Sequence, residues 1–338
     1  MTTSEQHTGS AGIEILMTAA MPTRDAAAFD RRFTMHRLWA SQAPEAMLSD
    51  VAPRIRGIAA GGPMRIDGPL MDRLPRLEIV ASFGAGYERV DVEAAAVRGI
   101  TVTNTPGVLT EEVADLAMAV MLSTIRRIPQ ADRFVREGKW LSGRFPLSAS
   151  LQGRKIGIVG LGRIGKAIAR RCAAFGVDVH YHGRTEVPDS GYRFCPTLLE
   201  LARTVDVMIL STPGDAGTHG MVDAPVLAAL GPDGILVNVS RGSVVDQDAL
   251  VAALRDRKIL AAGLDVFADE PEVPAELIAM DNVVLTPHVG SSSLRTWQNM
   301  SQLVLDNLTA WFEERGPLTP VVATRKTNSS EPDRARTA

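Results

Sequence analysis

The stretch that decides the fold reads Lys-Ile-Gly-Ile-Val-Gly-Leu-Gly-Arg-Ile-Gly-Lys-Ala-Ile-Ala, residues 155–169. Its apolar start predicts a buried parallel strand, and the residues after the glycines predict an amphipathic helix. The glycines between them have the spacing of a dinucleotide-binding turn. The first allows a tight turn, the second lets the backbone approach a pyrophosphate, and the third lets helix and strand pack closely. We therefore expect cofactor contacts from Gly160, Leu161, Gly162, Arg163, Ile164 and Gly165.

The following strand, Val177–Tyr181, indicates which nucleotide binds. A site that prefers NAD places a carboxylate at the tip of this strand to bind the ribose 2′-hydroxyl. Asp178 lies mid-strand, too early to do so, and the tip reads His182-Gly183-Arg184-Thr185. A guanidinium and a hydroxyl suit a 2′-phosphate, so contacts from Gly183, Arg184 and Thr185 favour NADPH, with NADH weaker. The alternative is a solvated Arg184 and a site that still accepts NADH.

Length and composition limit the class of protein to which this chain can belong. A chain of 338 residues is too long for one small core, so two domains are expected. A hydrophobic fraction of 45% with only 5% aromatic residues is typical of an α/β protein. The net charge of −3 and the lack of a basic cluster predict no nucleic-acid partner.

Cysteine usage and apolar stretches predict the compartment. Cys172 and Cys195 have neither metal-ligand nor disulfide spacing, which favours a reducing cytoplasm and no bound metal. The first dozen residues are polar and small, unlike a signal peptide. Val113–Leu122 is apolar but carries Asp115 and is too short to span a bilayer. We expect a soluble, cytoplasmic protein without a membrane partner.

Strand-like runs alternate with helical segments along the chain, which predicts two Rossmann-like or flavodoxin-like parallel-sheet domains. The runs of the first domain are Ile13–Met17, Phe33–Leu38, Ile55–Ala60, Leu77–Ser82 and Ile100–Thr103. Those of the second, besides the two above, are Val207–Leu210, Ile235–Asn238, Ala261–Asp265 and Val283–Leu285. Residues 1–11 and 325–338 lack periodicity and are expected to be disordered tails.

Three helices complete the expected organisation: Thr110 to about Arg127, Pro129–Gly138, and Ser293–Glu314. The last follows the final strand of the nucleotide domain, so we expect it to return to the first domain. The substrate-binding domain would then be discontinuous, 1–104 plus 291–324, around a nucleotide domain of 105–290. Two chain crossings make a hinged cleft, the usual place for a small ligand.

Polar residues follow three of the predicted buried strands. Val239, Ser240 and Arg241 follow one, Asp265 and Glu270 another, and His288 a third. Ligands bind outside the carboxyl ends of strands in an open α/β sheet, so these residues are expected near the nicotinamide.

The residue types after these strands suit reduction of a ketone. His288 can protonate the carbonyl oxygen near neutral pH. Glu270, if it bonds the other ring nitrogen, favours the charged imidazole, and Arg241 offers donors to a substrate carboxylate. Each also has a structural interpretation, as a strand end, a loop acid or a helix cap; their joint order behind a nucleotide turn favours catalysis.

The stretches Gly160–Gly165, Val239–Gly242, Leu264–Pro271 and Thr286–Gly290 resemble those of the D-isomer-specific 2-hydroxyacid dehydrogenases. The resemblance runs from about Arg56 to Val322. It implies a catalytic set of Arg241, Glu270 and His288, and an aspartate at the nicotinamide on Asp265. It also implies a homodimer in which the Thr110–Arg127 helix forms much of the contact. Trp140 either reaches a pocket of the partner subunit or covers a helix end. The stretches Leu77–Gly86 and Asn104–Thr110, with the tip His182–Thr185, look most like NADPH-dependent glyoxylate/hydroxypyruvate and hydroxyphenylpyruvate reductases. This similarity implies a substrate-carboxylate site at the N–H groups of Gly84, Ala85 and Gly86, opposite Arg241 and His288.

The resemblance implies NADPH-dependent reduction of small 2-oxo acids, glyoxylate or hydroxypyruvate, to D-2-hydroxy acids. A hydroxyphenylpyruvate-type reductase for larger 2-oxo acids is one alternative. A non-catalytic nucleotide sensor on the same fold is another, and a dehydrogenase acting on formate or phosphite is a third. Trp297 stands where related reductases often carry Arg, so the substrate preference can differ from theirs.

Overall fold

The computed structural model describes residues 12–25 and 27–321, in two α/β units. The chain passes from the first unit to the second between Leu109 and Thr110, and returns between Ser293 and Leu294. These positions lie close to the boundaries that the sequence suggests, 104/105 and 290/291. The tails predicted for 1–11 and 325–338 lie outside the described residues. The predicted fold class, two parallel-sheet α/β domains, is confirmed.

The first unit holds a five-stranded parallel sheet in the order β2-β1-β3-β4-β5. Its strands are β1 (Glu14–Met17), β2 (Thr34–Arg37), β3 (Ile55–Ala60), β4 (Ile79–Ser82) and β5 (Thr101–Thr103). Its helices are η1 (Leu38–Ala40), α1 (Pro44–Val51), α2 (Gly68–Asp72), α3 (Val92–Val97) and α11 (Leu294–Phe312).

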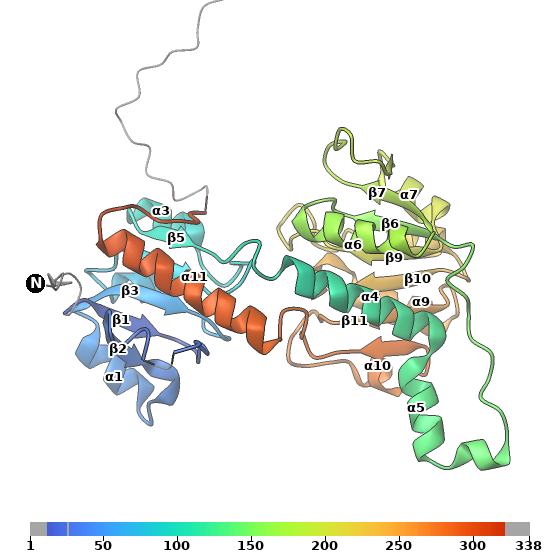
Figure 1. Cartoon of the computed structure of the whole chain (residues 1–338), viewed down its shortest axis with the longest axis horizontal. Helices are drawn as coiled ribbons and strands as arrows, with labels where there is room; N and C mark the ends of the chain where they lie inside the picture. Colours follow the sequence, from blue (N-terminus) through green and yellow to red (C-terminus); the bar gives the residue numbers. More distant parts are fainter. Residues whose placement is uncertain (1–11, 26, 322–338) are drawn as a thin grey trace, which may run out of the picture. The chain divides into compact units, whose positions relative to one another are not determined.

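Two apolar clusters cover the two faces of this sheet. Helix α11 lies along one face, where Val304, Leu305 and Leu308 pack with side chains of β1, β3 and β4 (Figure 1). Helices α1, α2 and α3 supply buried side chains to the cluster on the other face. The first unit therefore combines residues from both ends of the chain.

The second unit holds a seven-stranded parallel sheet in the order β12-β11-β10-β9-β6-β7-β8. Its strands are β6 (Lys155–Val159), β7 (Asp178–His182), β8 (Arg193–Phe194), β9 (Val207–Leu210), β10 (Ile235–Asn238), β11 (Ala261–Leu264) and β12 (Val283–Leu285). Its helices are α4 (Thr110–Arg126), α5 (Ile128–Arg136), η2 (Lys139–Ser142), α6 (Arg163–Ala174), α7 (Leu198–Thr204), α8 (Ala224–Leu230), η3 (Gly242–Val244), α9 (Gln247–Arg255) and α10 (Ala275–Ala279).

Helices cover both faces of this sheet. On one face α4 packs against α6, β10 and β11, and on the other α7, α8 and α9 contribute to a large apolar cluster (Figure 1). Strand order reverses between β6 and β9, the position at which such sheets bind nucleotides. The fold thus places the β6–α6 turn at the expected ligand site.

The structure differs from the sequence expectations in two details of this sheet. The short strand β8 was not predicted. Asp178 is the first residue of β7 rather than a mid-strand residue, and its carboxylate is 2.9 Å from Nε2 of the buried His180. The hydrogen bond from His180 lowers the pKa of the Asp178 carboxyl. Asp178 is therefore at the opposite end of β7 from the tip.

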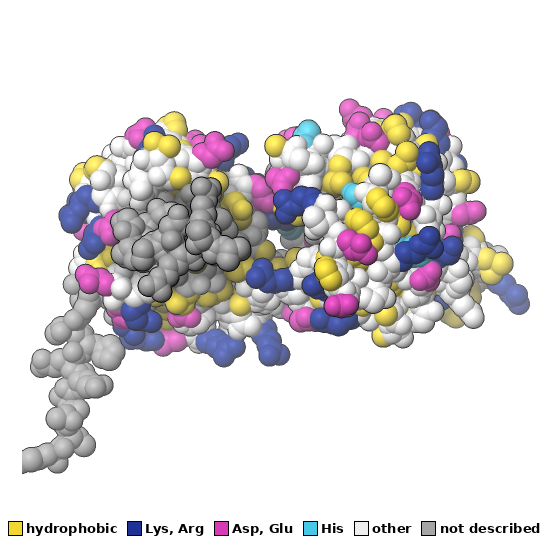
Figure 2. All heavy atoms as spheres, turned by 90° about the horizontal axis from the view of Figure 1, so that it is seen from above, with side chains coloured by type: hydrophobic (Ala, Val, Ile, Leu, Met, Phe, Trp, Pro, Cys, Tyr) yellow, Lys and Arg dark blue, Asp and Glu magenta, His cyan; other side chains and the backbone are white. Residues whose placement is uncertain are grey.

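Several whole-chain expectations concern cysteines, metals, membranes and charge. Cys172 and Cys195 are free and buried, and burial raises the pKa of the Cys172 thiol to about 12. Within residues 12–25 and 27–321, no cluster of three or more His, Cys, Asp or Glu could hold a metal ion. None of the helices described there has the length and apolar character needed to cross a bilayer. Basic and acidic side chains are intermixed on the face that Figure 2 draws.

Candidate active site

The turn between β6 and α6 has the backbone that its glycines predict. Gly160 has φ +94°, in the left-handed region that favours glycine. A Cβ on Gly165 would overlap the Gly160 carbonyl oxygen, so the close approach of α6 to the turn requires glycine there. Ser211, at the end of β9, donates from Oγ to the Gly160 carbonyl oxygen over 2.7 Å. The turn is therefore held from the neighbouring strand as well.

The same turn has room for a pyrophosphate. A Cβ on Gly162 would meet nothing within 4 Å, and Gly162 is the N-cap of α6 with no side chain capping it. The first N–H groups of a helix lack partners within the helix and carry partial positive charge. Arg163 is exposed and Ile164 half-buried in the first turn, whereas Leu161 is buried. These residues fit a dinucleotide, which the open space beside Gly162 would admit.

The tip of β7 lies beside this turn. The Gly160 N–H donates to the His182 carbonyl oxygen over 2.8 Å, so the strand tip and the glycine turn are joined directly. Gly183 is half-buried, and Arg184 and Thr185 are exposed. No residue from 182 to 185 carries a carboxylate that would repel a 2′-phosphate.

His288 and Glu270 form a hydrogen-bonded pair at the carboxyl edge of the sheet. They follow the adjacent strands β12 and β11, and His288 Nδ1 lies 2.7 Å from Glu270 Oε2. The Phe267 N–H donates to the other carboxylate oxygen over 3.1 Å. With Nδ1 used in this way, Nε2 is the ring atom left to face a ligand, and the His288 side chain is 46% exposed.

The surroundings of Glu270 keep it ionised. Burial raises the pKa of the Glu270 carboxyl, but hydrogen bonds from His288 and the Phe267 N–H, with the nearby charges of His288 and Arg241, bring it below its ordinary value. An ionised carboxylate beside Nδ1 fixes the orientation of the ring. The pair therefore presents Nε2 in a defined position at the carboxyl edge of the sheet.

Asp265 holds the segment that carries His288. Its Oδ1 accepts hydrogen bonds from Thr286 Oγ1 over 2.6 Å and from the Val289 N–H over 2.9 Å. Its Oδ2 accepts one from the Gly290 N–H over 2.9 Å. Burial raises the pKa of Asp265 above its ordinary value, although these hydrogen bonds oppose the rise. The contacts that the structure gives Asp265 thus position the residues on both sides of His288.

Arg241 follows β10, the next strand of the same edge. A Cβ on Gly214 would lie 2.7 Å from Arg241 Cγ, so the stem of the arginine packs against this glycine. Its Nη1 donates to the Ser240 carbonyl oxygen over 2.7 Å. Val239 and Ser240 are buried, and the Ser240 N–H donates to Asn238 Oδ1 over 3.0 Å, so this segment is fixed at the end of β10. Arg241 also helps to lower the pKa of the Glu270 carboxyl, so the two groups share one electrostatic environment.

The candidate carboxylate site, Gly84–Gly86, belongs to the first unit. Gly84 differs from the expectation, because its N–H donates to Thr105 Oγ1 over 3.0 Å and so is not open to a substrate. Asn104 Nδ2 donates to the Ala85 carbonyl oxygen over 2.7 Å and fixes the loop. Among the residues that the structure describes, the Ala85 and Gly86 N–H groups have no acceptor. These two groups are left to bind an anion.

Comparisons with known proteins agree with this site. The family model "D-isomer specific 2-hydroxyacid dehydrogenase, NAD binding domain" matches residues 118–290. Glyoxylate/hydroxypyruvate reductase A of Arabidopsis thaliana is 42% identical over 310 residues, which are 92% of this chain and 99% of that protein. Hydroxyphenylpyruvate reductase of Plectranthus scutellarioides matches with the same identity and coverage.

The chain belongs to the D-isomer-specific 2-hydroxyacid dehydrogenase family.

A solved structure supports the same assignment. An NADPH-dependent glyoxylate/hydroxypyruvate reductase from Sinorhizobium meliloti, in complex with NADP and malonate, is 47% identical with a TM-score of 0.84. The similarity covers 93% of this dehydrogenase and 99% of that chain. The predictions of family and enzyme class are confirmed.

Three residues of this dehydrogenase that position the site were missed in the sequence. Ser211, Thr286 and Thr105 each use a hydroxyl to hold a functional loop. Each follows a predicted strand by one or two residues, and that is the signal that could have marked them. The hydrogen-bond partner of each hydroxyl depends on the fold, so the sequence alone could not identify it.

Proposed function

We propose that this dehydrogenase reduces glyoxylate and hydroxypyruvate to D-2-hydroxy acids, with NADPH as the cofactor. The observation that carries the proposal is the Glu270–His288 hydrogen bond at the sheet edge that also bears the glycine turn and Arg241. A carboxylate-supported imidazole is a proton donor suited to a carbonyl oxygen.

The two units take different roles in this proposal. The second, with expected boundaries 105–290, binds the cofactor through the turn at Gly160–Gly165, the tip at Gly183–Thr185, and the segment Val239–Arg241 with Asp265. The first, 1–104 plus 291–324, supplies the Ala85 and Gly86 N–H groups to the substrate carboxylate. Successive N–H groups of a glycine loop form an anion-binding concavity, which supports this assignment.

Each catalytic side chain has one task. When bound, NADPH supplies the hydride that reaches the carbonyl carbon. His288 donates the proton from Nε2 to the carbonyl oxygen, while Glu270 keeps the ring oriented through Nδ1. Arg241 binds the substrate carboxylate and the carbonyl oxygen, where negative charge develops.

The preference for NADPH rests on Arg184 and Thr185. A guanidinium binds a phosphate in a charge-assisted, bidentate way that a ribose hydroxyl cannot match. The name of the Sinorhizobium meliloti relative, which is NADPH-dependent, agrees with this preference. NADH is expected to bind more weakly.

A larger 2-oxo acid is the second candidate substrate. The Phe83 ring packs edge-on against the Trp297 ring, with centroids 5.7 Å apart, directly before the Gly84–Gly86 loop. An aromatic pair beside the carboxylate site favours an apolar substituent. The Plectranthus scutellarioides relative is named a hydroxyphenylpyruvate reductase, which supports the same alternative.

We also propose a homodimer in the cytoplasm. The segment that begins with α5 has no buried residue in the helix and exposes 67% of Trp140, 95% of Leu141 and 99% of Leu147. Apolar side chains gathered on one exposed segment indicate a protein partner, and a second copy is the partner that the family resemblance implies. Free, buried cysteines suit a reducing compartment.

Absorbance at the nicotinamide band tests the function. Purified protein with NADPH should oxidise it fastest with glyoxylate or hydroxypyruvate, and chiral analysis should find the D-hydroxy acid. Faster turnover of 4-hydroxyphenylpyruvate would favour the second candidate. Binding of NADPH without turnover of any 2-oxo acid would point to the nucleotide sensor instead.

A further inference from the structure

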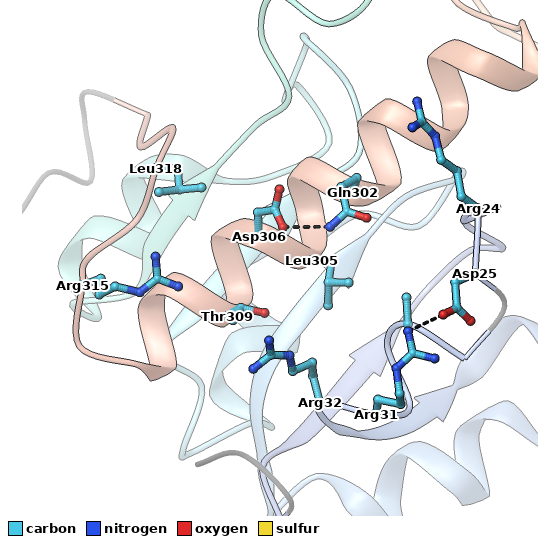
Figure 3. Close-up of a pocket in the computed structure, with 11 residues that line it drawn as sticks. Arg24, Asp25, Arg31, Arg32, Gln302, Leu305, Asp306, Thr309, Arg315 and Leu318 are labelled. Atoms are coloured by element: carbon cyan, nitrogen blue, oxygen red, sulfur yellow. Dashed lines mark hydrogen bonds and ion pairs between the residues drawn. The ribbon is translucent and has the colours of Figure 1, made fainter. Parts of the chain in front are cut away.

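A hollow of about 450 Å³ lies in the first unit, apart from every residue assigned above. It is bounded by the segment between β1 and β2, by α11, and by the residues after α11 (Figure 3). Small-molecule sites usually have volumes of ~300–1,000 Å³, so the hollow is large enough for a metabolite. Arginines from the β1–β2 segment and from the residues after α11 line it, together with two aspartates.

One face of α11 forms the wall of this hollow. Gln302, Leu305, Asp306 and Thr309 recur at helical spacing, and Leu305 is buried between the polar residues. At 1.5 Å per residue, the stretch from Gln302 to Thr309 is about 10 Å long. Gln302 Nε2 donates to Asp306 Oδ1 over 2.8 Å. Asp306 has no cationic partner among the described residues, so its carboxylate can accept further hydrogen bonds.

Two guanidinium groups converge at the other end of this face. Arg32 Nη1 is 3.2 Å from Glu313 Oε1, and Arg315 Nη2 is 2.6 Å from Glu313 Oε2. Both arginines line the hollow (Figure 3), and Glu313 is the one carboxylate in ion-pair contact with them among the described residues. The single negative charge of Glu313 is thus shared by the two positive charges of Arg32 and Arg315. The arrangement already binds one carboxylate, and a dianion in the place of Glu313 would balance the two positive charges.

The opposite wall carries its own ion pair. Arg31 and Asp25 are bonded to each other, so Arg31 is compensated locally. Arg24 reaches instead to the amide oxygen of Asn299, 3.1 Å away. The uncompensated positive charge near Thr309 therefore comes from Arg32 and Arg315.

We propose that this hollow is a binding site for a sugar phosphate. The phosphate, which carries about −1.5 to −2 charges near neutral pH, replaces Glu313 between Arg32 and Arg315. The hydroxyl groups lie along α11 and donate to Asp306, with Gln302 and Thr309 as further partners. A monocarboxylate lacks the charge to displace the tethered Glu313, which is why a phosphate ester fits better.

Calorimetric titration of the full chain with glucose 6-phosphate tests this site. Saturating NADPH is present, so that the phosphate-binding part of the cofactor site is filled. Binding should weaken about tenfold or more in Arg32→Gln and in Arg315→Gln, because each loses a charge-assisted contact. Glu313→Gln should bind more tightly than the unchanged chain, since the internal competitor is gone. Arg73→Gln, an exposed arginine paired with Glu45 elsewhere in the unit, is the matched control and should bind normally.

Glucose and inorganic phosphate serve as partial ligands. Both should bind more weakly than glucose 6-phosphate, because each occupies one end of the hollow. Absence of binding at millimolar concentration, equal binding by all variants, or weaker binding by Glu313→Gln would overturn the proposal. Inorganic phosphate binding as tightly as the sugar phosphate would overturn the role of Asp306.

Discussion

The Glu270 carboxylate accepts from a histidine ring and a backbone N–H, and this geometry explains why it stays ionised. The sequence could place Glu270 and His288 at the same sheet edge, because both follow buried strands. It could not establish their hydrogen bond, which depends on the turn after Leu264 bringing Glu270 back toward His288. The pairing of Asp265 with Thr286 depends on the fold in the same way.

Replacement of Glu270 by Gln is expected to change the pH profile of reduction. The hydrogen bond from His288 helps to hold the pKa of Glu270 below its ordinary value, so the carboxylate that faces Nδ1 is ionised. In Glu270→Gln that negative charge is lost, and the high-pH limb of kcat should move to lower pH. Glu272→Gln, an exposed acid two residues away, should leave the limb in place. A limb that stays fixed in Glu270→Gln would refute the coupling.

Replacement of Arg184 by Ala tests the cofactor preference. The KM for NADPH should rise about tenfold or more, because a charge-assisted phosphate contact is lost, while the KM for NADH changes little. Steady-state kinetics with both cofactors measure this difference. Arg203→Ala, on the exposed side of α7, serves as the control. Equal effects on the two cofactors would contradict the assignment.

Among the elements, α6 is the one whose position the glycines determine most directly. The long strand runs and α4, α6 and α11 were predictable because their apolar periodicity is strong. Strand β8 was not, because two residues carry no periodicity. His180 in β7 is buried although it is polar, because this strand is covered on both faces. Its burial could therefore not be predicted from the residue type.

Gly162 and Gly165 are needed for different reasons, Gly165 for folding and Gly162 for cofactor binding. A Cβ on Gly165 overlaps the Gly160 carbonyl oxygen, so Gly165→Ala should destabilise the second unit by on the order of 3 kcal/mol. Gly162 has φ −78° and an open surrounding, so Gly162→Ala should keep the melting temperature. It should instead weaken NADPH binding, because the methyl group occupies the space of the pyrophosphate. Calorimetry and cofactor titration read out the two effects, and identical behaviour of the two variants would be inconsistent with this division.

At the scale of the whole molecule, the family and the two parallel sheets were predictable because the glycine turn and the strand ends are local patterns. The hollow beside α11 was not, because its walls come from segments almost 300 residues apart, Arg24 and Arg315. The exposed apolar side chains after α5 were predictable only in part, with Trp140 singled out in the sequence.

Sedimentation velocity tests the proposed homodimer. The unchanged chain should sediment at twice its mass, and a Trp140→Ala, Leu141→Ala, Leu147→Ala variant should shift toward the monomer, because these side chains lose apolar contact area. Val97→Ala, on the 87% exposed side chain of α3, should remain a dimer. A monomeric unchanged chain, or a triple variant that still pairs, would rule out this interface.

The return of α11 to the first unit also affects the order of events on the ribosome. The second unit is one continuous stretch, so it can fold as soon as residue 293 has emerged. The sheet of the first unit emerges before the second unit but lacks Val304, Leu305 and Leu308 on one face until α11 has emerged as well. The unit whose strands emerge first is thus the last of the two to reach its native state, and its uncovered strands are the surface that a nascent-chain chaperone would protect.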